Sequence, residues 1–226
     1  MEITSPFSDN VVFVYGQVSA VDIAQVTETL GNAERSYLER VTSEKRRTDF
    51  IAGRYFARKA LAELKYTVSD LDREDNGAPV WPKGIVGSIS HNNGIVICAV
   101  ASSSEYLALG VDVQQVSAAN NYQSLLERVC CESEKSLVEN CDNPQLRLIQ
   151  LFSAKEALFK AADALVKQAP IKQPLSFKNV QLTTNNGHTF QISKIDGPPT
   201  ALDINPARVN ITSLVFGEHA VSGVTL

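Results

Sequence analysis

The segment 152–160, with the sequence FSAKEALFK, holds an acid and a base that an ordinary amphipathic helix does not need. Its apolar residues recur with helical spacing, and Glu156 lies about 40° from Phe152 on the same side of the predicted helix. A carboxylate beside an apolar face must be satisfied by a metal, a cation or hydrogen-bond donors, so the position indicates a metal or phosphate site. The alternative is an ion pair with Lys160, one turn further on, which stabilises a helix by about 0.2 to 0.5 kcal/mol.

A second acid, Asp112, lies inside a predicted strand. Side chains alternate along a strand, so Asp112 and Gln114 face one way while Val111 and Val113 face the other. Acids are depleted in strand interiors, which favours a ligand role, although an exposed strand face is an equal alternative. Asp112 and Glu156 together are a minimal pair of oxygen ligands for magnesium, whose other positions are filled by water and substrate phosphates.

Three arginines follow one another along a predicted helix over residues 43–64. Arg47, Arg54 and Arg58 fall within about 40° of each other, beside the apolar stripe of that helix. Guanidinium groups bind phosphate through planar, multidentate hydrogen bonds, so this arginine stripe predicts a clamp for an anionic ligand. A solvated row of charges is the alternative.

Ser90 and His91 lie where the first strand of a predicted hairpin enters its turn. Asn93-Gly94 supplies the positive-φ pair of a tight turn, and we expect this position to expose both the serine and the histidine side chains. They do not form a Ser-His-Asp nucleophile, because adjacent residues on a strand point to opposite faces. An ordinary surface histidine is the alternative interpretation of His91.

The elements that must position these residues follow one plan twice. Strands are predicted at residues 11–15, 87–90, 95–101 and 107–116. Helical patterns are predicted at residues 20–42, 43–64, 122–140 and 146–167. A proline-bearing connection at 170–174 and several short strands from 177 to 226 follow. We therefore predict an α+β protein of two related halves, residues 1–105 and 106–226, with the seam near 102–104. A ligand cleft between the halves is the expected place for a site.

Composition excludes several classes of protein. The chain has 226 residues, 44% of them hydrophobic, and a formal charge of −4 with a pI near 5.4, which argues against a general binder of nucleic acid or membrane surfaces. Four cysteines without C-x-x-C pairing and three widely spaced histidines exclude zinc and haem spacing. No signal pattern or apolar run of roughly 18 residues occurs, so we expect a cytoplasmic protein with free thiols and no membrane span.

Five motifs occur in one order along residues 45–160. They are Ala52-Gly53-Arg54, the run GAPVWP at 77–82, GSISH at 87–91, GVDV at 110–113 and FSAKEALFK at 152–160. Together they resemble the 4′-phosphopantetheinyl transferase family, and most of all its long, monomeric members that serve enterobactin-type siderophore synthases. The two acidic motifs are the most specific of the five. GVDV alone would be a weak signal, but chance does not readily produce five motifs in the same order along one chain.

The resemblance implies two pseudo-symmetric α/β halves with coenzyme A bound between them, in a monomer. It also implies transfer of phosphopantetheine from coenzyme A to a serine of an apo acyl, peptidyl or aryl carrier protein, with release of 3′,5′-ADP. Asp112 and Glu156 would hold magnesium, and Lys160 would contact the transferred phosphate. Carried over in the same way, the residues that bind the nucleotide end are Arg54, Arg73, Ser90 and His91, with Arg47 and Arg58 from the arginine stripe nearby.

The resemblance leaves two positions open. Glu134 falls where the family has an acid proposed as general base, and Glu132 is a close alternative. Gln114 stands where many members have a second acid in the strand motif; its amide oxygen could ligate magnesium without adding charge. A relative that binds coenzyme A or carrier proteins without catalysis, and a nucleic-acid binder that uses the arginine stripe, are the functional alternatives.

Overall fold

The computed structural model describes residues 3–75, 77–116, 121–166, 176–196 and 205–226. Its helices and strands are β1 (Val12–Gln17), α1 (Ile23–Glu28), α2 (Asn32–Arg40), α3 (Glu44–Glu63), β2 (Ile85–Asn92), β3 (Ile95–Ser102), β4 (Leu109–Gln115), α4 (Tyr122–Val129), α5 (Glu132–Glu139), α6 (Pro144–Val166), β5 (Val180–Thr183), β6 (Thr189–Ile195), β7 (Asn210–Phe216) and β8 (His219–Thr225). The predicted connection at 170–174 and the last residue of the predicted helix 146–167 lie outside the described residues.

The two halves repeat one topology, which confirms the α+β class and its duplicated plan. In the first, β1 is followed by helices ending in the long α3 and then by the β2–β3 hairpin, and the sheet order is β1-β3-β2. In the second, β4 is followed by helices ending in the long α6, and the order begins β4-β8-β7 before continuing to β6 and β5. In each half, the last strand of the chain (β3 or β8) therefore lies between the first strand (β1 or β4) and the strand with which the last strand forms a hairpin (β2 or β7).

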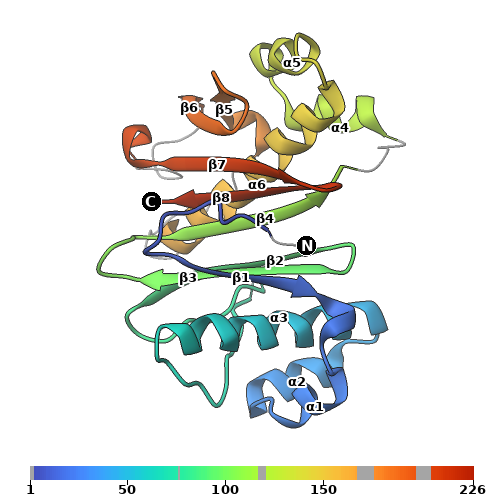
Figure 1. Cartoon of the computed structure of the whole chain (residues 1–226), viewed down its shortest axis with the longest axis vertical. Coiled ribbons are helices and arrows are strands. Elements are labelled where there is room, and N and C mark those ends of the chain that lie inside the picture. Colours follow the sequence, from blue (N-terminus) through green and yellow to red (C-terminus); the bar gives the residue numbers. More distant parts are fainter. Residues whose placement is uncertain (1–2, 76, 117–120, 167–175, 197–204) are drawn as a thin grey trace.

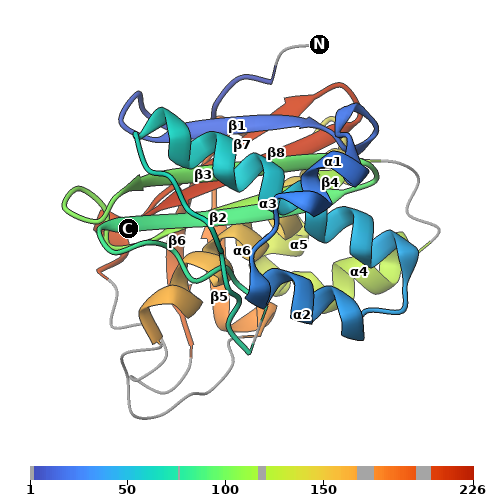
Figure 2. The ribbon, with the colours of Figure 1, turned by 90° about the horizontal axis from the view of Figure 1, so that it is seen from below.

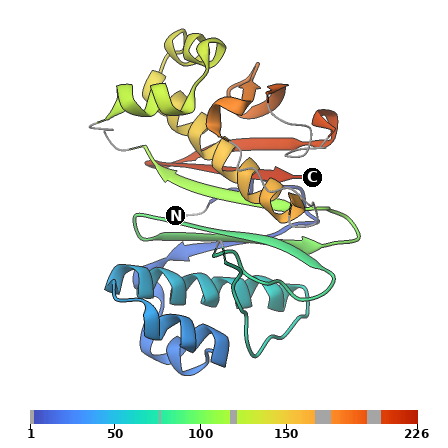
Figure 3. The same ribbon diagram turned by 180° about the vertical axis from the view of Figure 1, so that it is seen from behind.

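The two sheets lie between the two long helices. Figure 1 shows α3 against the three-stranded sheet, and Figure 3 shows α6 running across the five-stranded sheet. Alternate residues of β3 pack in opposite directions, as the period of two requires. Val96, Cys98 and Val100 pack with α3, whereas Ile97, Ala99 and Ala101 pack with β4 and β8. A buried apolar layer thus joins the halves and fixes α3 and α6 relative to each other.

The predicted hairpin is confirmed. β2 and β3 pair in antiparallel register, and Asn93 and Gly94 between them have φ values of 44° and 79°. Figure 2, seen from below, shows β1, β3 and β2 side by side over α3. The expected helical stretch at 122–140 is instead two helices, because the chain is extended at Cys130 and Cys131 before α5 begins.

In the described part of the chain, no helix combines the length and the apolar character that crossing a bilayer requires. Cys98 and Cys130 are buried free thiols, and Cys131 and Cys141 are partly exposed free thiols, as expected.

Gly110 lets α6 approach β4 closely. A Cβ atom at this position would lie 1.8 Å from the backbone oxygen of Ala157, so no larger side chain fits without moving the helix. Gly110→Ala is therefore expected to lower the free energy of unfolding by about 1 to 3 kcal/mol, the usual cost of overpacking. Urea unfolding of both proteins measures the difference.

The matched control is Gly53→Ala in α3, where a Cβ atom would meet only Ile89 at 3.5 Å. Alanine is the better helix former, so this variant is expected to be as stable as the parent chain or more so. Equal midpoints for Gly110→Ala and the parent chain would contradict the close contact between α6 and β4.

Candidate active site between the two halves

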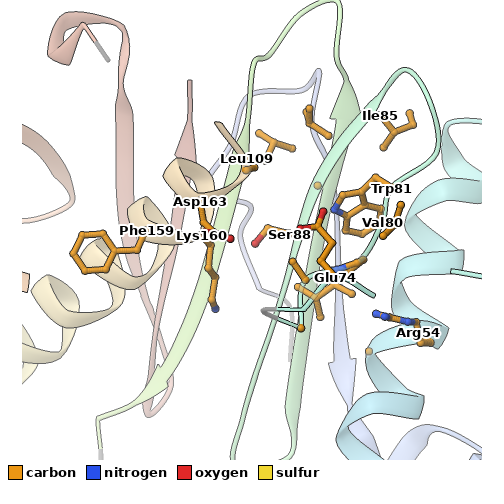
Figure 4. Close-up of a pocket in the computed structure, with 18 of the residues that line it drawn as sticks. Arg54, Glu74, Val80, Trp81, Ile85, Ser88, Leu109, Phe159, Lys160 and Asp163 are labelled. Atoms are coloured by element: carbon orange, nitrogen blue, oxygen red, sulfur yellow. The ribbon is translucent and has the colours of Figure 1, made fainter. Parts of the chain in front are cut away.

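A cavity of about 760 Å³ opens between the two halves. Its walls are formed by α3, β2, Glu74, residues 77–81 and the C-terminal part of α6. Figure 4 shows Lys160 and Asp163 on α6 at one side, Arg54 on α3 at the other, and Ser88 between them. One part of the wall is apolar and includes Trp81 and Leu109. The cleft can therefore hold a ligand that has both charged and apolar parts.

Asp112 is buried next to Lys160, with 2% of its surface exposed, and does not itself line the cavity. Its Oδ1 accepts hydrogen bonds from Lys160 Nζ at 2.8 Å and from Ser90 Oγ at 2.9 Å. The Lys160 ammonium also donates to Ser90 Oγ and to the Val111 carbonyl. β4 and α6 thus place the predicted carboxylate and the predicted phosphate-binding lysine in direct contact across the helix–sheet interface.

Glu156 has no hydrogen-bond or ion-pair partner among the described residues. The expected alternative, a helical ion pair with Lys160, is wrong, because Lys160 reaches Asp112 on β4 instead. Burial raises the pKa of the Glu156 carboxyl, and the nearby Asp112 raises it further, while Lys160 opposes the shift. A half-buried carboxylate without a partner, close to a second carboxylate, is an arrangement that a cation would stabilise.

The raised pKa of Glu156 predicts a pH dependence of stability. The folded protein binds a proton at Glu156 more tightly than the unfolded chain does, because burial raises this pKa above its ordinary value of 4.5. The free energy of unfolding should therefore fall as pH rises from about 4.5, the ordinary pKa, through the raised pKa of the folded state. The Glu156→Gln variant has no ionisable group at this position, so its free energy of unfolding lacks this dependence on pH.

Urea unfolding of the parent chain and Glu156→Gln from about pH 4 to pH 8, with divalent cations chelated, measures the effect. We expect the variant to gain stability relative to the parent chain as pH rises. Parallel stability curves for the two proteins would show that Glu156 titrates alike in the folded and unfolded states.

Gln114 lies beside Asp112, as the strand period predicts, but its orientation differs from the prediction. Its Nε2 donates to Asp112 Oδ2 at 2.9 Å, and its Oε1 accepts from Asn92 Nδ2 at 3.1 Å. The amide oxygen therefore points away from Asp112 and is not a metal ligand in this arrangement. An uncharged donor suits this position because a carboxylate accepts hydrogen bonds only.

The predicted three-arginine clamp is not formed, because most of the arginine stripe binds protein groups. Arg58 donates to both carboxylate oxygens of the buried Glu34, at 2.8 and 2.5 Å, and Arg47 donates to the Leu38 carbonyl. Glu34 also accepts from the Gly31 amide at the start of α2. Arg47 and Arg58 therefore fasten α2 to α3, which also removes the feature on which the nucleic-acid alternative depended.

Arg54 alone of the three lines the cleft. It is 3% exposed, stacks on the Phe50 ring at 4.5 Å, and lies 3.4 Å from Glu34. That distance runs from its buried Nε to Glu34 Oε1 without a hydrogen bond, and burial lowers the pKa of the guanidinium to about 10 despite Glu34. A cationic guanidinium at the wall of a cavity suits an anionic ligand.

The other predicted nucleotide-binding residues occupy three different settings. His91 lines the cleft with 46% of its side chain exposed and its Nδ1 3.6 Å from Asp49; the partial burial of its ring lowers its pKa, although Asp49 opposes this. Arg73 stacks on the Tyr37 ring at 4.2 Å and is not among the residues that line the cleft. Ser90 was expected to be exposed, which is wrong: it is 6% exposed, because its side of β2 faces β4.

Glu134 lies in the core of the second half, fully buried. It accepts hydrogen bonds from Lys155 Nζ at 2.7 Å, from the Cys131 amide at 3.0 Å and from the Leu182 amide at 2.8 Å. A general base must reach the proton that it accepts. The structure therefore gives Glu134 a structural role in place of the predicted catalytic one, whereas Glu132 has an 89% exposed side chain.

Sequence reasoning missed Asp49, which is 7% exposed and lines the cleft on α3. Its Oδ2 accepts from Lys45 at 2.7 Å and faces His91. The Lys45–Asp49 spacing of four residues was a signal in the sequence, but it is also the spacing of an ordinary surface pair. Phe159 and Ser88 also line the cleft without having been singled out.

Two family models match the chain. Residues 33–101 match the 4′-phosphopantetheinyl transferase N-terminal domain, and residues 108–219 match the 4′-phosphopantetheinyl transferase superfamily. The predicted boundary after residue 105 falls between the two matched regions and stays a prediction.

Three curated relatives illustrate the similarity. The chain is 33% identical over 145 residues to 4′-phosphopantetheinyl transferase Npt of Nocardia iowensis, covering 64% of each protein. It is 32% identical over 124 residues to enterobactin synthase component D of Escherichia coli O157:H7, covering 53% of this chain and 56% of that one. It is 30% identical over 146 residues to 4′-phosphopantetheinyl transferase PptT of Mycobacterium tuberculosis, covering 64% of this chain and 61% of that one. The match thus spans between 56% and 64% of these relatives.

Proposed function

The chain belongs to the 4′-phosphopantetheinyl transferase superfamily, and from this premise we propose that it transfers phosphopantetheine from coenzyme A to a serine of an apo carrier protein. In this reaction the serine oxygen attacks the β-phosphorus of coenzyme A. The bond from that phosphorus to the bridging oxygen breaks, and 3′,5′-ADP leaves with the electron pair. The proposal extends a partial match to the whole chain, and the alternative is a relative that binds coenzyme A without transfer.

The observation that carries the proposal is Lys160, which lines the same cleft as Arg54 and contacts Asp112, with Glu156 near enough to both for their charges to shift its pKa. The two carboxylates do not line the cleft themselves. A lysine at a cavity with a pair of carboxylates from different elements behind it is suited to phosphate chemistry, in which positioning and charge stabilisation do most of the work. Arg54 and His91, which both line the cleft, would bind the phosphates of the nucleotide end.

The donor set fits magnesium. Glu156 is a half-buried carboxylate without a hydrogen-bond or ion-pair partner in the described part of the chain, and burial together with the charge of Asp112 raises its pKa. No cluster of three metal-binding side chains occurs in the described ranges, but magnesium is usually bound through one or two carboxylates with water and substrate phosphates as further ligands. Asp112 and Glu156 would hold the ion, which when bound would neutralise charge on the pyrophosphate.

The protein's own groups divide the remaining work. Lys160 Nζ, at the edge of the cleft with 32% of its side chain exposed, would donate to the transferred phosphate and offset the charge that gathers on its oxygens. The apolar wall at Trp81 and Leu109 would exclude water from part of the ligand. The serine proton requires a base other than Glu134, because that carboxylate is fully buried and bonded.

Incubation with coenzyme A, magnesium and purified apo carrier domains tests the proposal directly. Intact-mass measurement should show the carrier gaining the mass of phosphopantetheine, and a carrier with its acceptor serine replaced by alanine should gain none. A panel of acyl, peptidyl and aryl carriers would identify the partner class. One of the relatives is named as a component of enterobactin synthase, so siderophore-type carriers belong in the panel.

Chelation of divalent cations followed by restoration of magnesium tests the metal requirement. The rate should be lost on chelation and restored by the ion. If no carrier gains mass while calorimetry shows coenzyme A binding, the binding-only alternative holds. The monomeric state and the cytoplasmic location stay predictions.

A further inference from the structure

Asp49 is an acid in the lining of a cleft whose proposed ligand is itself an anion. It lies on α3, is 7% exposed, and lines the cleft together with Arg54 and His91. A carboxylate repels a phosphate, so Asp49 is not suited to bind the ligand directly. Any use that it has for coenzyme A must pass through a neighbouring cation.

Asp49 joins a lysine of its own helix to a histidine of the facing strand. Its Oδ2 accepts a hydrogen bond from Lys45 Nζ at 2.7 Å and lies 3.6 Å from Nδ1 of His91 on β2. Lys45 is on the solvent side of this contact, with 74% of its side chain exposed. The packing of α3 on β2 therefore holds the carboxylate against one particular nitrogen of the imidazole ring.

The contact decides which nitrogen of His91 is left for a ligand. A carboxylate accepts hydrogen bonds only, so Nδ1, the nitrogen nearest Asp49, carries the proton of the neutral ring. Nε2 is then the nitrogen that takes up a second proton. The imidazolium formed in this way can donate from Nε2 to a phosphate oxygen in a charge-assisted hydrogen bond.

His91 is surrounded by charges of both signs. Asp49 on α3 and Asp112 on β4 favour the protonated ring. Lys160 on α6 and Lys45 on α3 oppose it. Burial has the largest effect and lowers the pKa of His91 below its ordinary value of 6.5, so the ring is mostly neutral at pH 7. A phosphate that arrives at the ring adds an anion and raises this pKa.

We propose that Asp49 is a positioning residue, which leaves Nε2 of His91 to the cleft and supports the imidazolium form of His91 when a phosphate monoester binds there. This inference rests on the proposed function and adds a proton-coupled step to it. As coenzyme A binds, Nε2 takes up a proton from the solvent. Coenzyme A has one phosphate monoester, on its ribose, and 3′-dephospho-coenzyme A lacks that group.

Titration of the free protein, followed by nuclear magnetic resonance, tests the contact. The imidazole signals of His91, assigned with a His91→Gln variant, report its pKa. Asp49→Asn should lower the pKa of His91, because the ring loses a counter-charge, and Asp49→Glu, which keeps a carboxylate, should bring it back toward the parent value.

Lys45→Gln is the matched control, because it removes the other partner of Asp49. It should raise the pKa of His91, since the Lys45 charge opposes protonation of the ring. Opposite shifts in Asp49→Asn and Lys45→Gln are expected from charge alone. Shifts of the same sign would overturn the proposal, because a disturbed structure would then be the cause.

Calorimetry of coenzyme A binding in buffers of different ionisation enthalpy measures the proton uptake. At about pH 7.5, where a phosphate monoester is already doubly ionised, the parent chain should take up part of one proton for each coenzyme A bound. Asp49→Asn should take up less, and so should the parent chain with 3′-dephospho-coenzyme A. Equal uptake in the parent chain and Asp49→Asn, or with the two ligands, would overturn the proposal.

Steady-state kinetics provides a further readout. KM for coenzyme A should rise with pH as the bound His91 loses its proton, and in Asp49→Asn the rise should begin at a lower pH, with kcat little changed. Profiles of KM against pH that coincide for the two proteins would contradict the role of Asp49.

Failure of the proposed function would be visible separately. A parent chain that transfers nothing to any carrier in the mass assay contradicts that function, whereas the titration of His91 in the free protein requires no transfer. An active parent chain whose Asp49→Asn variant matches it in the pKa of His91 and in proton uptake contradicts the role of Asp49 alone.

Discussion

Glu156→Gln is expected to abolish transfer of phosphopantetheine while leaving the fold intact. Of the two proposed magnesium ligands, Glu156 is the one without a hydrogen-bond or ion-pair partner among the residues that the structure describes, so its charge is available for the cation. Glutamine keeps the shape but loses that charge. Loss of one electrostatic contact to a transition state commonly lowers kcat by about a hundredfold or more, and we expect at least that fall.

The measurement is the rate of carrier modification, with circular dichroism and urea unfolding recorded on the same samples. Glu63→Gln, at the exposed C-terminal end of α3, is the control for replacing a glutamate on a helix surface, and should keep the parent rate. Because burial disfavours the ionised form of Glu156, the variant should be no less stable than the parent chain at neutral pH. A near-normal rate in Glu156→Gln would remove the metal role.

Glu134→Ala is expected to lower the free energy of unfolding by about 3 to 5 kcal/mol, the usual cost of leaving one member of a buried ion pair without its partner. Lys155 is fully buried, and within the described ranges its ammonium donates to Glu134, to the Val129 carbonyl and to the Phe177 carbonyl. Without Glu134, this ammonium is buried with no counter-charge, and two backbone amides lose their acceptor. Urea unfolding measures the change.

The same variant separates a structural role from a catalytic one. If Glu134 were the general base, its loss would lower the reaction rate and leave the free energy of unfolding nearly unchanged. Its observed burial predicts instead that the free energy of unfolding is the quantity that falls most. Glu132→Ala is the control, because that side chain is exposed on the same helix and surface substitutions usually change stability by within about 0.5 kcal/mol. If Glu134→Ala unfolds at the parent urea concentration and has lost its rate, the structural role is contradicted.

Local periodicity was enough to determine which residues share a face. The alternation along β4 placed Asp112 and Gln114 together, opposite Val111, and the structure has that arrangement. The helical period placed Glu156 at the edge of the apolar side of α6, and Asn93-Gly94 predicted the hairpin turn. The order of the motifs indicated the family, and Gly110 in one of them is the residue that lets α6 approach β4.

Tertiary structure alone decided which partner each charged group has. Lys160 pairs with Asp112 on another element although Glu156 is one turn away on its own helix. Arg58 of the arginine stripe pairs with Glu34, an acid of a different helix, and Glu134 is neutralised by Lys155. Ser90 is buried because β4, 22 residues later in the chain, lies against its strand.

The physical reason is the range of the interactions. Backbone periodicity is a local property, so the sequence by itself determined the faces of the helices and strands, the turn, and the set of chemical groups that the family motifs bring together. Ion pairs and hydrogen bonds act over a few ångströms in space, whatever the separation along the chain, so partners depend on how the halves pack. Only the packed structure showed that Asp112, Lys160 and Ser90 form one cluster and that Glu134 is outside it.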